Sequence, residues 1–155
     1  MDEHDAHIPL ERQLCFALYS ASRTIQQAYK PILNDMGITF PQYLVLVTLW
    51  DEDDRTVSQI GQKLQLDSNT LTPLLKRMEA MGLVVRTRDA ADERQVRLRL
   101  TGAGRDFQAR AGEFVDCVVS KTGLSVEELT SLQARITLLR DRLRGRCDPE
   151  PDAAF

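Results

Sequence analysis

The segment 57–82, VSQIGQKLQLDSNTLTPLLKRMEAMG, decides the fold. Its first eight residues carry apolar side chains at three- and four-residue intervals, which predicts a short helix with a single packed face. Polar residues follow, and Ser68 is the expected N-cap of a second helix. That helix has four apolar residues at helical spacing between positions 71 and 78, and Gly82 is expected to end it. The segment therefore predicts two short helices joined by a turn.

A short basic hairpin is expected after these helices. The segment 83–88, LVVRTR, is rich in β-forming residues, and the loop 89–94, DAADER, is polar. The segment 95–100, QVRLRL, alternates polar and apolar residues, as a half-buried strand does. Helix, turn, second helix and hairpin form the layout of a winged helix. We therefore predict a mainly α fold with a small β-hairpin wing, in which 57–100 is the winged helix-turn-helix module.

Length and composition fit one helix-rich domain. The chain has 155 residues, of which 43% are hydrophobic and 6% aromatic, and this length is enough for a real core. No apolar run approaches the ~20 residues that a membrane span needs. The acidic start of the chain, MDEHD, does not resemble a signal peptide. We therefore expect a cytoplasmic protein that makes no membrane contact.

Cysteine and histidine usage gives no indication of a metal or cofactor. Cys15, Cys117 and Cys147 are an odd number of cysteines at wide spacing, so reduced thiols are expected. His4 and His7 are the only histidines, and their spacing would suit two ligands of one metal ion. No other ligand lies nearby in the sequence. A polar N-terminal arm is the stronger interpretation, and neither a metal nor a cofactor is expected.

The charge distribution is uneven along the chain. The formal net charge is −3, yet the segment 57–100 holds eight Lys or Arg and only five Asp or Glu, so it carries +3 and the remainder −6. A basic patch on an acidic body fits a surface that faces DNA. A mixed, solvated face is the alternative, and charge alone does not decide between the two.

Two amphipathic helices are expected before the module. One spans about 10–33, with apolar residues at three- and four-residue steps. The second, 43–50, is apolar nearly all round and is expected to be buried. Thr39 is its candidate cap, and Pro41 suits its first turn. The segment 51–56 is read as a polar turn that leads into the module.

Two more helices are expected after the module, one from Thr101 to Gly123 and a final one through Leu143. The pattern Ser125-Val-Glu-Glu128 predicts a capping box at the start of the final helix. The tail, 146–155, has no periodicity and is expected to be flexible.

The flanking helices carry more apolar surface than one small module can cover. We therefore expect 10–50 and 101–145 to be dimerisation helices that pair with those of a second copy. An intertwined homodimer would present two second helices, and if these lie about one DNA turn apart (~34 Å) it would bind a pseudo-palindromic operator in double-stranded DNA.

The module also carries a recognisable signature. The segment 67–86, DSNTLTPLLKRMEAMGLVVR, together with Asp92-Glu93-Arg94-Gln95-Val96, resembles the core of the MarR family of winged-helix regulators, and the resemblance extends over nearly the whole chain. It implies a homodimer whose helix from about Ser68 enters the major groove. It also implies that Arg94, steadied by Asp92, is the wing residue that enters the adjacent minor groove.

The residue types agree with those roles. Short polar side chains near a helix N-terminus suit phosphates and base edges, and cations further along suit phosphates or a guanine edge. Arg97 flanks the wing and is expected to neutralise backbone charge. The full set of candidate DNA-binding residues is Ser68, Asn69, Thr70, Thr72, Pro73, Lys76, Arg77, Arg86, Arg88, Asp92 and Arg94.

A narrower resemblance concerns Cys15. The segments 14–21, LCFALYSA, and 39–43, TFPQY, together with Tyr29, resemble the organic-hydroperoxide-resistance regulators, the OhrR branch of the family. The resemblance implies that organic hydroperoxide is the signal. It also implies that tyrosines hold the Cys15 thiolate, that Cys15 is oxidised to sulfenic acid, and that DNA is then released. A small residue packed on its helix is the alternative for Cys15.

Helix geometry bears on this site. Cys15 and Tyr29 are 14 residues apart, about 21 Å along one helix, so they can meet only across a two-fold axis. Tyr19 is the neighbour within the same chain, and Arg12 is placed to favour the anion. Phe40 stands where the branch commonly has tyrosine, which removes one hydroxyl.

The resolving thiol is open at this stage. Two-cysteine members of the branch carry a resolving cysteine near the end of the first C-terminal helix, and Cys117 lies about one turn before that position. It is either the resolving cysteine or a small core residue. Cys147 in the tail is interpreted as an exposed thiol without a role, and competition as the resolver is its alternative.

Three other functions are compatible with parts of the sequence. One is a MarR-type repressor that is released by a small aromatic ligand, with Cys15 structural. Another is a winged helix used only for protein contact. The third, a thiol peroxidase, is not expected, because the chain lacks a βαβ pattern, a Cys-x-x-Cys pair and metal or phosphate motifs.

Overall fold

The computed structural model describes residues 7–147, with side chains as far as residue 145. His4, the side chain of Cys147 and most of the tail lie outside the described residues. The chain divides into two units, Met1–Val115 and Asp116–Phe155. The elements in chain order are η1 (Leu10–Arg12), α1 (Leu14–Met36), α2 (Phe40–Asp51), β1 (Arg55–Thr56), α3 (Val57–Leu64), α4 (Ser68–Ala80), β2 (Val84–Arg88), β3 (Val96–Leu100), α5 (Gly102–Asp106), η2 (Phe107–Arg110), α6 (Ala111–Thr122) and α7 (Val126–Cys147).

The predicted first helix is divided. The 3-10 turn η1 is separated from α1 by Gln13, whose backbone is extended and whose side-chain amide donates to the carbonyl of Ile8 over 2.9 Å. Helix α1 then continues three residues past the predicted end and stops where Gly37 adopts a left-handed conformation, with φ of 69°. Glycine reaches this region without steric cost.

Helix α2 begins with the predicted cap. The Thr39 hydroxyl accepts from the backbone N–H of Gln42, and the Gln42 side chain accepts from the backbone N–H of Thr39, over 3.4 and 2.9 Å. Two of the amides that a helix start leaves without partners are satisfied in this way. Pro41 lies in the first turn, as predicted.

The helix-turn-helix is present, but its cap is not Ser68. Asp67 has the extended backbone of an N-cap, and its carboxylate accepts from the backbone N–H of Thr70 over 2.8 Å, while Ser68 is already the first helical residue. This hydrogen bond holds the pKa of Asp67 below its ordinary value. The turn before it is tight, because a Cβ on Gly61 would lie 2.8 Å from the carbonyl oxygen of Leu66.

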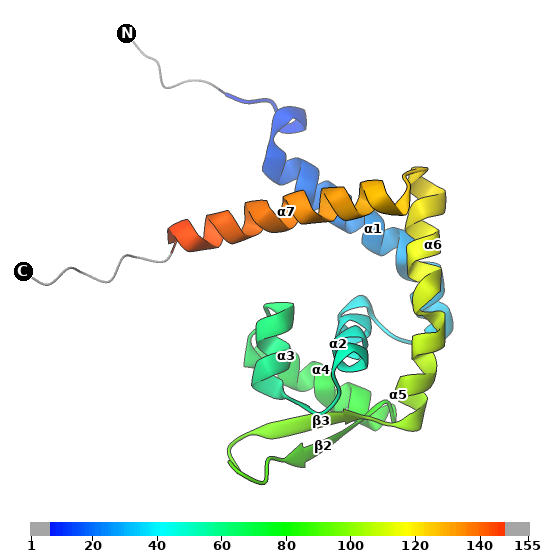
Figure 1. Ribbon diagram of the computed structural model, residues 1–155, viewed down its shortest axis with the longest axis vertical. Coiled ribbons are helices and arrows are strands. Elements are labelled where there is room, and N and C mark those ends of the chain that lie inside the picture. Colours follow the sequence, from blue (N-terminus) through cyan, green and yellow to red (C-terminus); the bar gives the residue numbers. More distant parts are fainter. Residues whose placement is uncertain (1–6, 148–155) are drawn as a thin grey trace, which may run out of the picture. The chain divides into compact units, whose positions relative to one another are not determined.

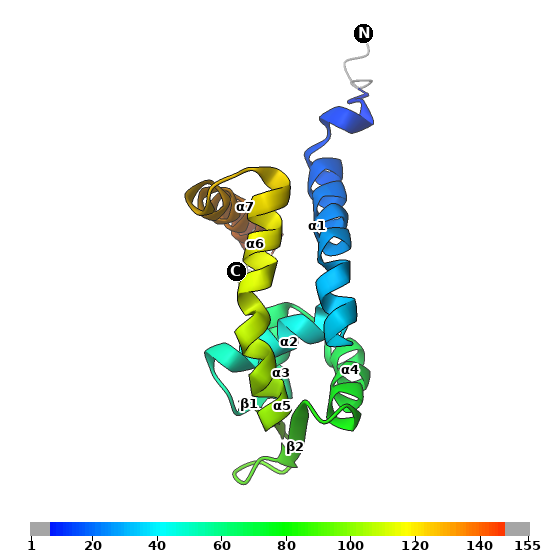
Figure 2. The same cartoon turned by 90° about the vertical axis from the view of Figure 1, so that its right-hand side faces the viewer.

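The hairpin is part of a three-stranded antiparallel sheet in the order β1-β3-β2. Strands β2 and β3 form the predicted hairpin, with Val84 opposite Leu100 and Arg88 opposite Val96. The prediction of a plain polar turn over 51–56 was wrong at its end, because β1 pairs with the outer edge of β3. Helices α2, α3 and α4 gather beside the sheet, and the loop between β2 and β3 projects from it (Figures 1 and 2).

A single hydrophobic core joins α2, α3, α4 and the sheet. Leu46 and Leu49 of α2, Ile60 of α3, Leu71 of α4 and Leu98 of β3 are at most 1% exposed. Burying each such side chain contributes about 1.5–3 kcal/mol. The prediction that α2 is buried is confirmed, and the core fixes α4 and the hairpin relative to each other.

The predicted long helix after the hairpin is interrupted. Helix α5 gives way to the 3-10 segment η2 before α6 begins, and the expected end at Gly123 is confirmed, with φ of 69°. Trp50 of α2 donates to the carbonyl of Gly104 in α5 over 2.9 Å. A Cβ on Gly104 would lie 2.2 Å from the carbonyl oxygen of Leu83. Only glycine fits here, where α5 contacts the start of β2.

Helix α7 forms most of the second unit. The predicted capping box is present: Ser125 and Glu128 exchange side-chain to backbone hydrogen bonds of 2.8 and 3.2 Å. The helix runs to Cys147, so the predicted tail begins two residues later than expected.

In the described part of the chain, no single helix is long and apolar enough to cross a membrane. Helices α1 and α2 meet that test only when taken together, on length and composition, and they are bent by 77° at the break between them. Several side chains of α2 are buried in the core, and core helices meet the same test.

Candidate nucleic-acid interface and thiol site

The first turns of α4 expose short polar side chains. Ser68, Asn69 and Thr70 are exposed, and Thr72 is half-buried. These groups stand at the positive end of the helix dipole, where backbone N–H groups point outward. The arrangement can donate hydrogen bonds to phosphate oxygens or base edges.

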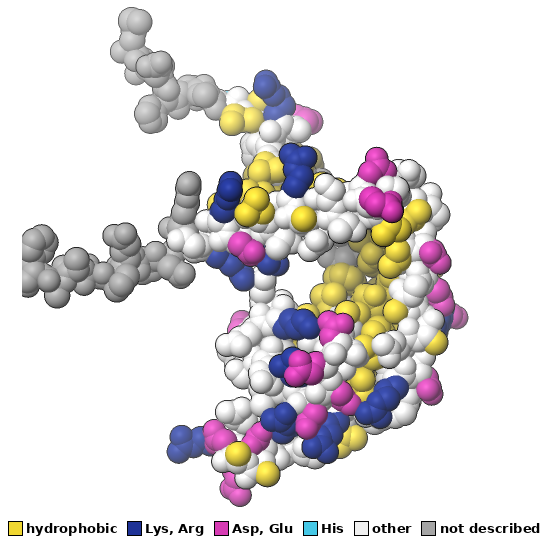
Figure 3. Space-filling model, in the orientation of Figure 1, with side chains coloured by type: hydrophobic (Ala, Val, Ile, Leu, Met, Phe, Trp, Pro, Cys, Tyr) yellow, Lys and Arg dark blue, Asp and Glu magenta, His cyan; other side chains and the backbone are white. Residues whose placement is uncertain are grey.

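Cations extend this surface along α4 and the hairpin. Lys76 and Arg77 are exposed on α4, as are Arg88 at the end of β2 and Arg94 in the hairpin loop. Among the described residues, none of these four side chains makes an ion pair. On the face that Figure 3 shows, acidic side chains are interspersed with Lys and Arg. Unpaired cations are the groups that can neutralise phosphates.

A cavity of about 270 Å³ lies between α4 and the hairpin. Its lining includes Ser68 and Thr72 of α4, Arg86 of β2 and Arg94 of the loop. Four of the predicted DNA-binding residues, from three segments, therefore share one concave surface.

The hairpin loop holds Arg94 by its backbone. The Asp92 carboxylate accepts from the backbone N–H of Arg94 over 3.1 Å and from the side-chain amide of Gln95 over 3.4 Å. The expected contact between Asp92 and Arg94 is thus present, through the main chain. The guanidinium of Arg94 makes no ion pair with the described residues.

Other arginines of the hairpin are paired. Arg86 donates to Glu79 of α4, with 2.8 Å between Nε and the carboxylate, and this contact holds the pKa of Glu79 below its ordinary value. Arg97 bridges the carboxylates of Asp54 and Asp89 over 2.8 and 2.7 Å. Arg97 was predicted to neutralise DNA charge, but its own charge is already balanced within the chain.

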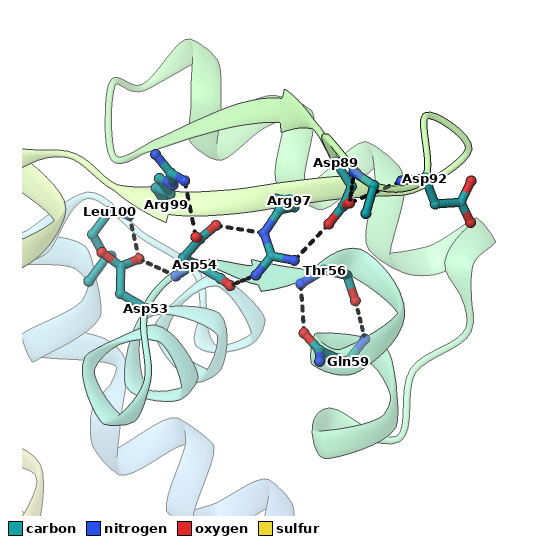
Figure 4. A network of polar contacts seen from close by, with 10 residues as sticks. Asp53, Asp54, Thr56, Gln59, Asp89, Asp92, Arg97, Arg99 and Leu100 are labelled. Carbon is teal, nitrogen blue, oxygen red and sulfur yellow. Dashed lines mark hydrogen bonds and ion pairs between the residues drawn. The ribbon is translucent and has the colours of Figure 1, made fainter.

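The sequence reasoning missed this bridge (Figure 4). Asp54 precedes the module by three residues and was assigned to a polar turn, and 43 positions separate it from Arg97. The local signal is the density of acids in the run from Asp51 to Asp54, but no periodicity links that run to a strand so distant in sequence.

Cys15 lies on the first turn of α1 and is exposed. Its Sγ donates to the side-chain carbonyl of Gln13 over 3.5 Å. An open hollow beside it is lined by His7, Ile8, Arg12, Gln13 and Leu14. The thiol is therefore accessible to a small oxidant from this side, and Arg12 is near it as expected.

Within one chain, the two predicted tyrosines have contacts with residues other than Cys15. The Tyr19 hydroxyl accepts from Arg23 over 3.0 Å, and the Arg23 guanidinium lies 5.6 Å from the centre of the Tyr19 ring. The Tyr29 ring packs against Phe40 and Phe114, with centroids 6.0 and 5.0 Å apart.

The aromatic cluster continues into the core of the first unit. Tyr43 stacks on Phe114 at 3.9 Å, and burial raises the pKa of Tyr43. Phe40, which replaces the expected tyrosine, packs on Tyr29 and offers no hydroxyl.

Cys117 belongs to the second unit and is half-buried on α6. Its Sγ is one of two described cysteine thiols, and the side chain of Cys147 lies outside the described residues. Within the described range, no group of three or more His, Cys, Asp or Glu side chains is placed to hold a metal ion.

Comparison with known proteins gives consistent matches. Residues 27–110 match the family model "Transcriptional regulator SarA/Rot". The organic hydroperoxide resistance transcriptional regulator of Bacillus subtilis is 41% identical over 94% of this chain and 99% of its own. The HTH-type transcriptional regulator TtmR of Methylorubrum extorquens is 44% identical over 88% of this chain and 70% of its own.

Solved structures match as well. Reduced AbfR bound to DNA superposes with a TM-score of 0.76 at 39% identity, covering 90% of this chain and 95% of that one. Disulfide-formed AbfR gives a TM-score of 0.62 at 39% identity, covering 90% and 93%. The fold therefore occurs in a protein whose structure was solved on DNA and also in a disulfide state.

Proposed function

The chain belongs to the SarA/Rot family of winged-helix transcriptional regulators, and on this premise we propose that it is a DNA-binding repressor that senses organic hydroperoxides through Cys15. The resemblance to the organic-hydroperoxide-resistance regulators is confirmed by the Bacillus subtilis relative. The observation that carries the proposal is an accessible thiol on the first turn of α1, in a chain whose relatives include a hydroperoxide-resistance regulator.

The proposed DNA contact uses the exposed groups of α4 and the hairpin. The first turns of α4 enter the major groove, with Ser68, Asn69, Thr70, Thr72 and Pro73 near base edges and phosphates. Lys76, Arg77 and Arg88 neutralise phosphates, and Arg94 enters the minor groove beside them. These roles are supported by the exposure of the four cations, which make no ion pair with described residues.

Arg86 fits this contact less directly. It lines the cavity between α4 and the hairpin, but Glu79 already holds its guanidinium. We propose that Arg86 fixes the angle between α4 and β2 and that Asp92 fixes the loop backbone at Arg94.

A homodimer is proposed from exposed apolar surface. Large apolar side chains are 39–58% exposed on each of the two long helices, which is unusual for a monomer with nothing to cover them. Those on α1 are Leu14, Tyr19 and Ile25, and those on α7 are Val126, Leu132, Ile136, Leu138 and Leu143. A second copy would cover them, and two copies of α4 would then bind a pseudo-palindromic operator. Such a regulator acts where the DNA is, so we propose a cytoplasmic location.

The proposed sensing step is a two-electron oxidation. The Cys15 thiolate attacks one peroxide oxygen, an S–O bond forms and the O–O bond breaks. The alkoxide leaves, takes up a proton and becomes an alcohol, while Cys15 becomes a sulfenic acid. A second thiol then displaces water to form a disulfide, and Cys117 is our candidate for that thiol.

The tyrosine partners are proposed to come from two copies. Cys15 and Tyr29 are on one helix and about 21 Å apart along it, so only the partner subunit's Tyr29 can approach Cys15. Tyr19 lies four residues after Cys15 on α1, and its hydroxyl oxygen accepts from Arg23, which leaves its O–H able to donate to the thiolate.

The test is DNA release by cumene hydroperoxide, followed by fluorescence anisotropy. The Cys15→Ser protein is expected to bind DNA as the wild type does and to stay bound after peroxide. Cys117→Ser is the matched control: it is expected to release DNA when Cys15 is oxidised, but to lack the disulfide between Cys15 and residue 117. A Cys15→Ser protein that leaves the DNA on peroxide addition would contradict the sensor role.

A second candidate is release by a small aromatic ligand, and the cavity of about 270 Å³ on the DNA-facing side favours it. A ligand bound there would occupy space between α4 and the hairpin. Release of DNA from the Cys15→Ser protein by an aromatic acid such as benzoate, without any oxidant, would select this candidate.

A further inference from the structure

The start of strand β3, next to the hairpin loop, is tied to the segment that precedes the helix-turn-helix. The Arg97 guanidinium, on β3, contacts the Asp54 carboxylate through Nε over 2.8 Å and donates through Nη2 to the Asp54 carbonyl oxygen. Its Nη1 reaches the Asp89 carboxylate over 2.7 Å. One side chain therefore joins the loop before β1 to the first residue of the hairpin loop (Figure 4).

The contact continues along the hairpin loop toward Arg94. While one oxygen of Asp89 accepts from Arg97, the other accepts from the backbone N–H groups of Ala91 and Asp92 over 2.8 and 3.1 Å. Asp92 in turn accepts from the backbone N–H of Arg94. A continuous series of hydrogen bonds thus runs from Asp54 to the main chain at Arg94.

The other end of the series is also held in place. Asp54 has a left-handed backbone, with φ of 59°, which is uncommon for a residue other than glycine. Its carboxylate pairs with Arg99 as well as Arg97, over 3.1 Å, and these contacts lower its pKa to about 2. Asp53 accepts from the backbone N–H of Leu100 over 2.9 Å. The loop therefore holds β3 at two points.

We propose that Asp54, Arg97 and Asp89 are positioning residues for the wing: they make no DNA contact and act by fixing the direction in which Arg94 approaches the groove. The proposal rests on the proposed role of Arg94 in DNA binding. The Arg97 side chain is only 30% exposed and is paired on both sides, whereas Arg94 is exposed and its guanidinium has no such partner among the described residues. The three residues we assign here hold the loop, and Arg94 binds.

The test exploits a difference in sign. DNA is an anion, so removing a negative charge from the wing should tighten binding if only electrostatics matters. Asp89→Asn removes one such charge. Its remaining carbonyl oxygen can still accept from Ala91 and Asp92, but its amide group cannot accept from Arg97. We expect Asp89→Asn to bind operator DNA about tenfold more weakly than the wild type, because Arg94 loses its support.

The matched control is Glu93→Gln. Glu93 is in the same loop, is exposed and makes no side-chain hydrogen bond or ion pair with the described residues. Its substitution removes the same charge without disturbing the series, so it should bind DNA as tightly as the wild type or slightly more tightly. Asp89→Asn binding that equals or exceeds Glu93→Gln binding would overturn the proposal.

Two further variants test the positioning role at the other residues of the series. Asp54→Asn weakens the other end of the series and suits the left-handed backbone, which asparagine tolerates. It should weaken binding in the same direction. Arg97→Lys, which can pair with only one carboxylate at a time, should recover part of what Arg97→Ala loses. Far-UV circular dichroism and thermal melting check that each variant is folded.

A double-mutant cycle separates this proposal from the function on which it rests. In the Arg94→Ala background, Asp89→Asn should have little further effect on binding, because the residue that it positions is absent. If Arg94→Ala binds DNA as the wild type does, the proposed role of Arg94 fails and the positioning role fails with it. If Arg94→Ala weakens binding and Asp89→Asn weakens it by an equal factor in both backgrounds, only the positioning role is contradicted.

Discussion

Helix α4 and strand β3 carry similar side chains but hold them differently. On α4, Lys76 and Arg77 are exposed and make no ion pair with described residues. On β3, Arg97 and Arg99 are paired with Asp54, and Arg97 is also paired with Asp89. The unpaired cations of α4 can bind an external anion, whereas the paired arginines of β3 fix the geometry of the chain. Residue type alone does not distinguish them.

The largest expected effect is a loss of stability when the close contact between α5 and the hairpin is disrupted. Gly104→Ala would place a Cβ about 2.2 Å from the carbonyl oxygen of Leu83, where α5 contacts the start of β2. The backbone must shift, and we expect a loss of about 3 kcal/mol or more in the free energy of unfolding. Urea unfolding followed by circular dichroism measures this loss.

Gly102→Ala is the control for that substitution. It lies in the same short helix, and a Cβ there meets no atom within 4 Å. Alanine is favoured over glycine in a helix, so this variant should be as stable as the wild type or slightly more so. Equal destabilisation by both substitutions would mean that the close contact between α5 and β2 does not hold the hairpin.

A smaller effect should separate the two kinds of arginine on one strand. Arg88 is exposed and makes no ion pair with described residues, whereas Arg86, two positions earlier, is paired with Glu79. If Arg88 contacts a phosphate, Arg88→Ala should reduce the slope of log binding constant against log salt concentration by about 0.9. Arg86→Ala should leave the slope unchanged, even where it weakens binding.

Anisotropy titrations at several salt concentrations measure these slopes. A slope that falls for Arg86→Ala and not for Arg88→Ala would mean that Arg86, and not Arg88, contacts a phosphate.

The smallest expected effect is on the pH dependence of the stability that Asp54 contributes. The Arg99 and Arg97 contacts hold the pKa of Asp54 at about 2, below its ordinary value. A carboxyl group with a lowered folded-state pKa stabilises the fold above its unfolded pKa, near 4, and that contribution is lost as the pH falls toward the folded value. The melting temperature of the wild type should therefore exceed that of Asp54→Asn at pH 7, and the difference should shrink between about pH 4 and pH 2. A difference that stays constant across that range would contradict the pairing.

The parts of the fold that depend on neighbouring residues could be predicted from the sequence. The Thr39 cap, the Ser125 capping box, the buried α2 and the hairpin all follow from patterns within a few residues. Ser68 was wrong as the N-cap, because Asp67 beside it is an equally suitable acceptor and only the backbone conformation decides. The break at η2 was missed because the apolar pattern continues through it.

The parts that depend on distant residues could not be predicted. Strand β1 and the Asp54–Arg97 pair join segments 43 positions apart, and a single sequence gives no signal for such a pairing. In the candidate site, the exposed residues of α4 and the loop lie where the pattern indicated. Arg97, expected to neutralise DNA charge, is paired with Asp54 and Asp89, and the Tyr19 hydroxyl contacts Arg23 within the chain. The proposed contact between Cys15 and the partner subunit's Tyr29 involves a second copy, which one chain does not supply.

The most direct test of the central claim measures the oxidation of Cys15 and the loss of DNA in the same sample. Operator-bound protein is titrated with cumene hydroperoxide, and at each step anisotropy gives the bound fraction. Mass spectrometry after dimedone and iodoacetamide treatment then gives the state of each cysteine. We expect the bound fraction to fall in proportion to the Cys15 that has lost its thiol. Release of DNA while Cys15 still reacts fully with iodoacetamide would contradict the account.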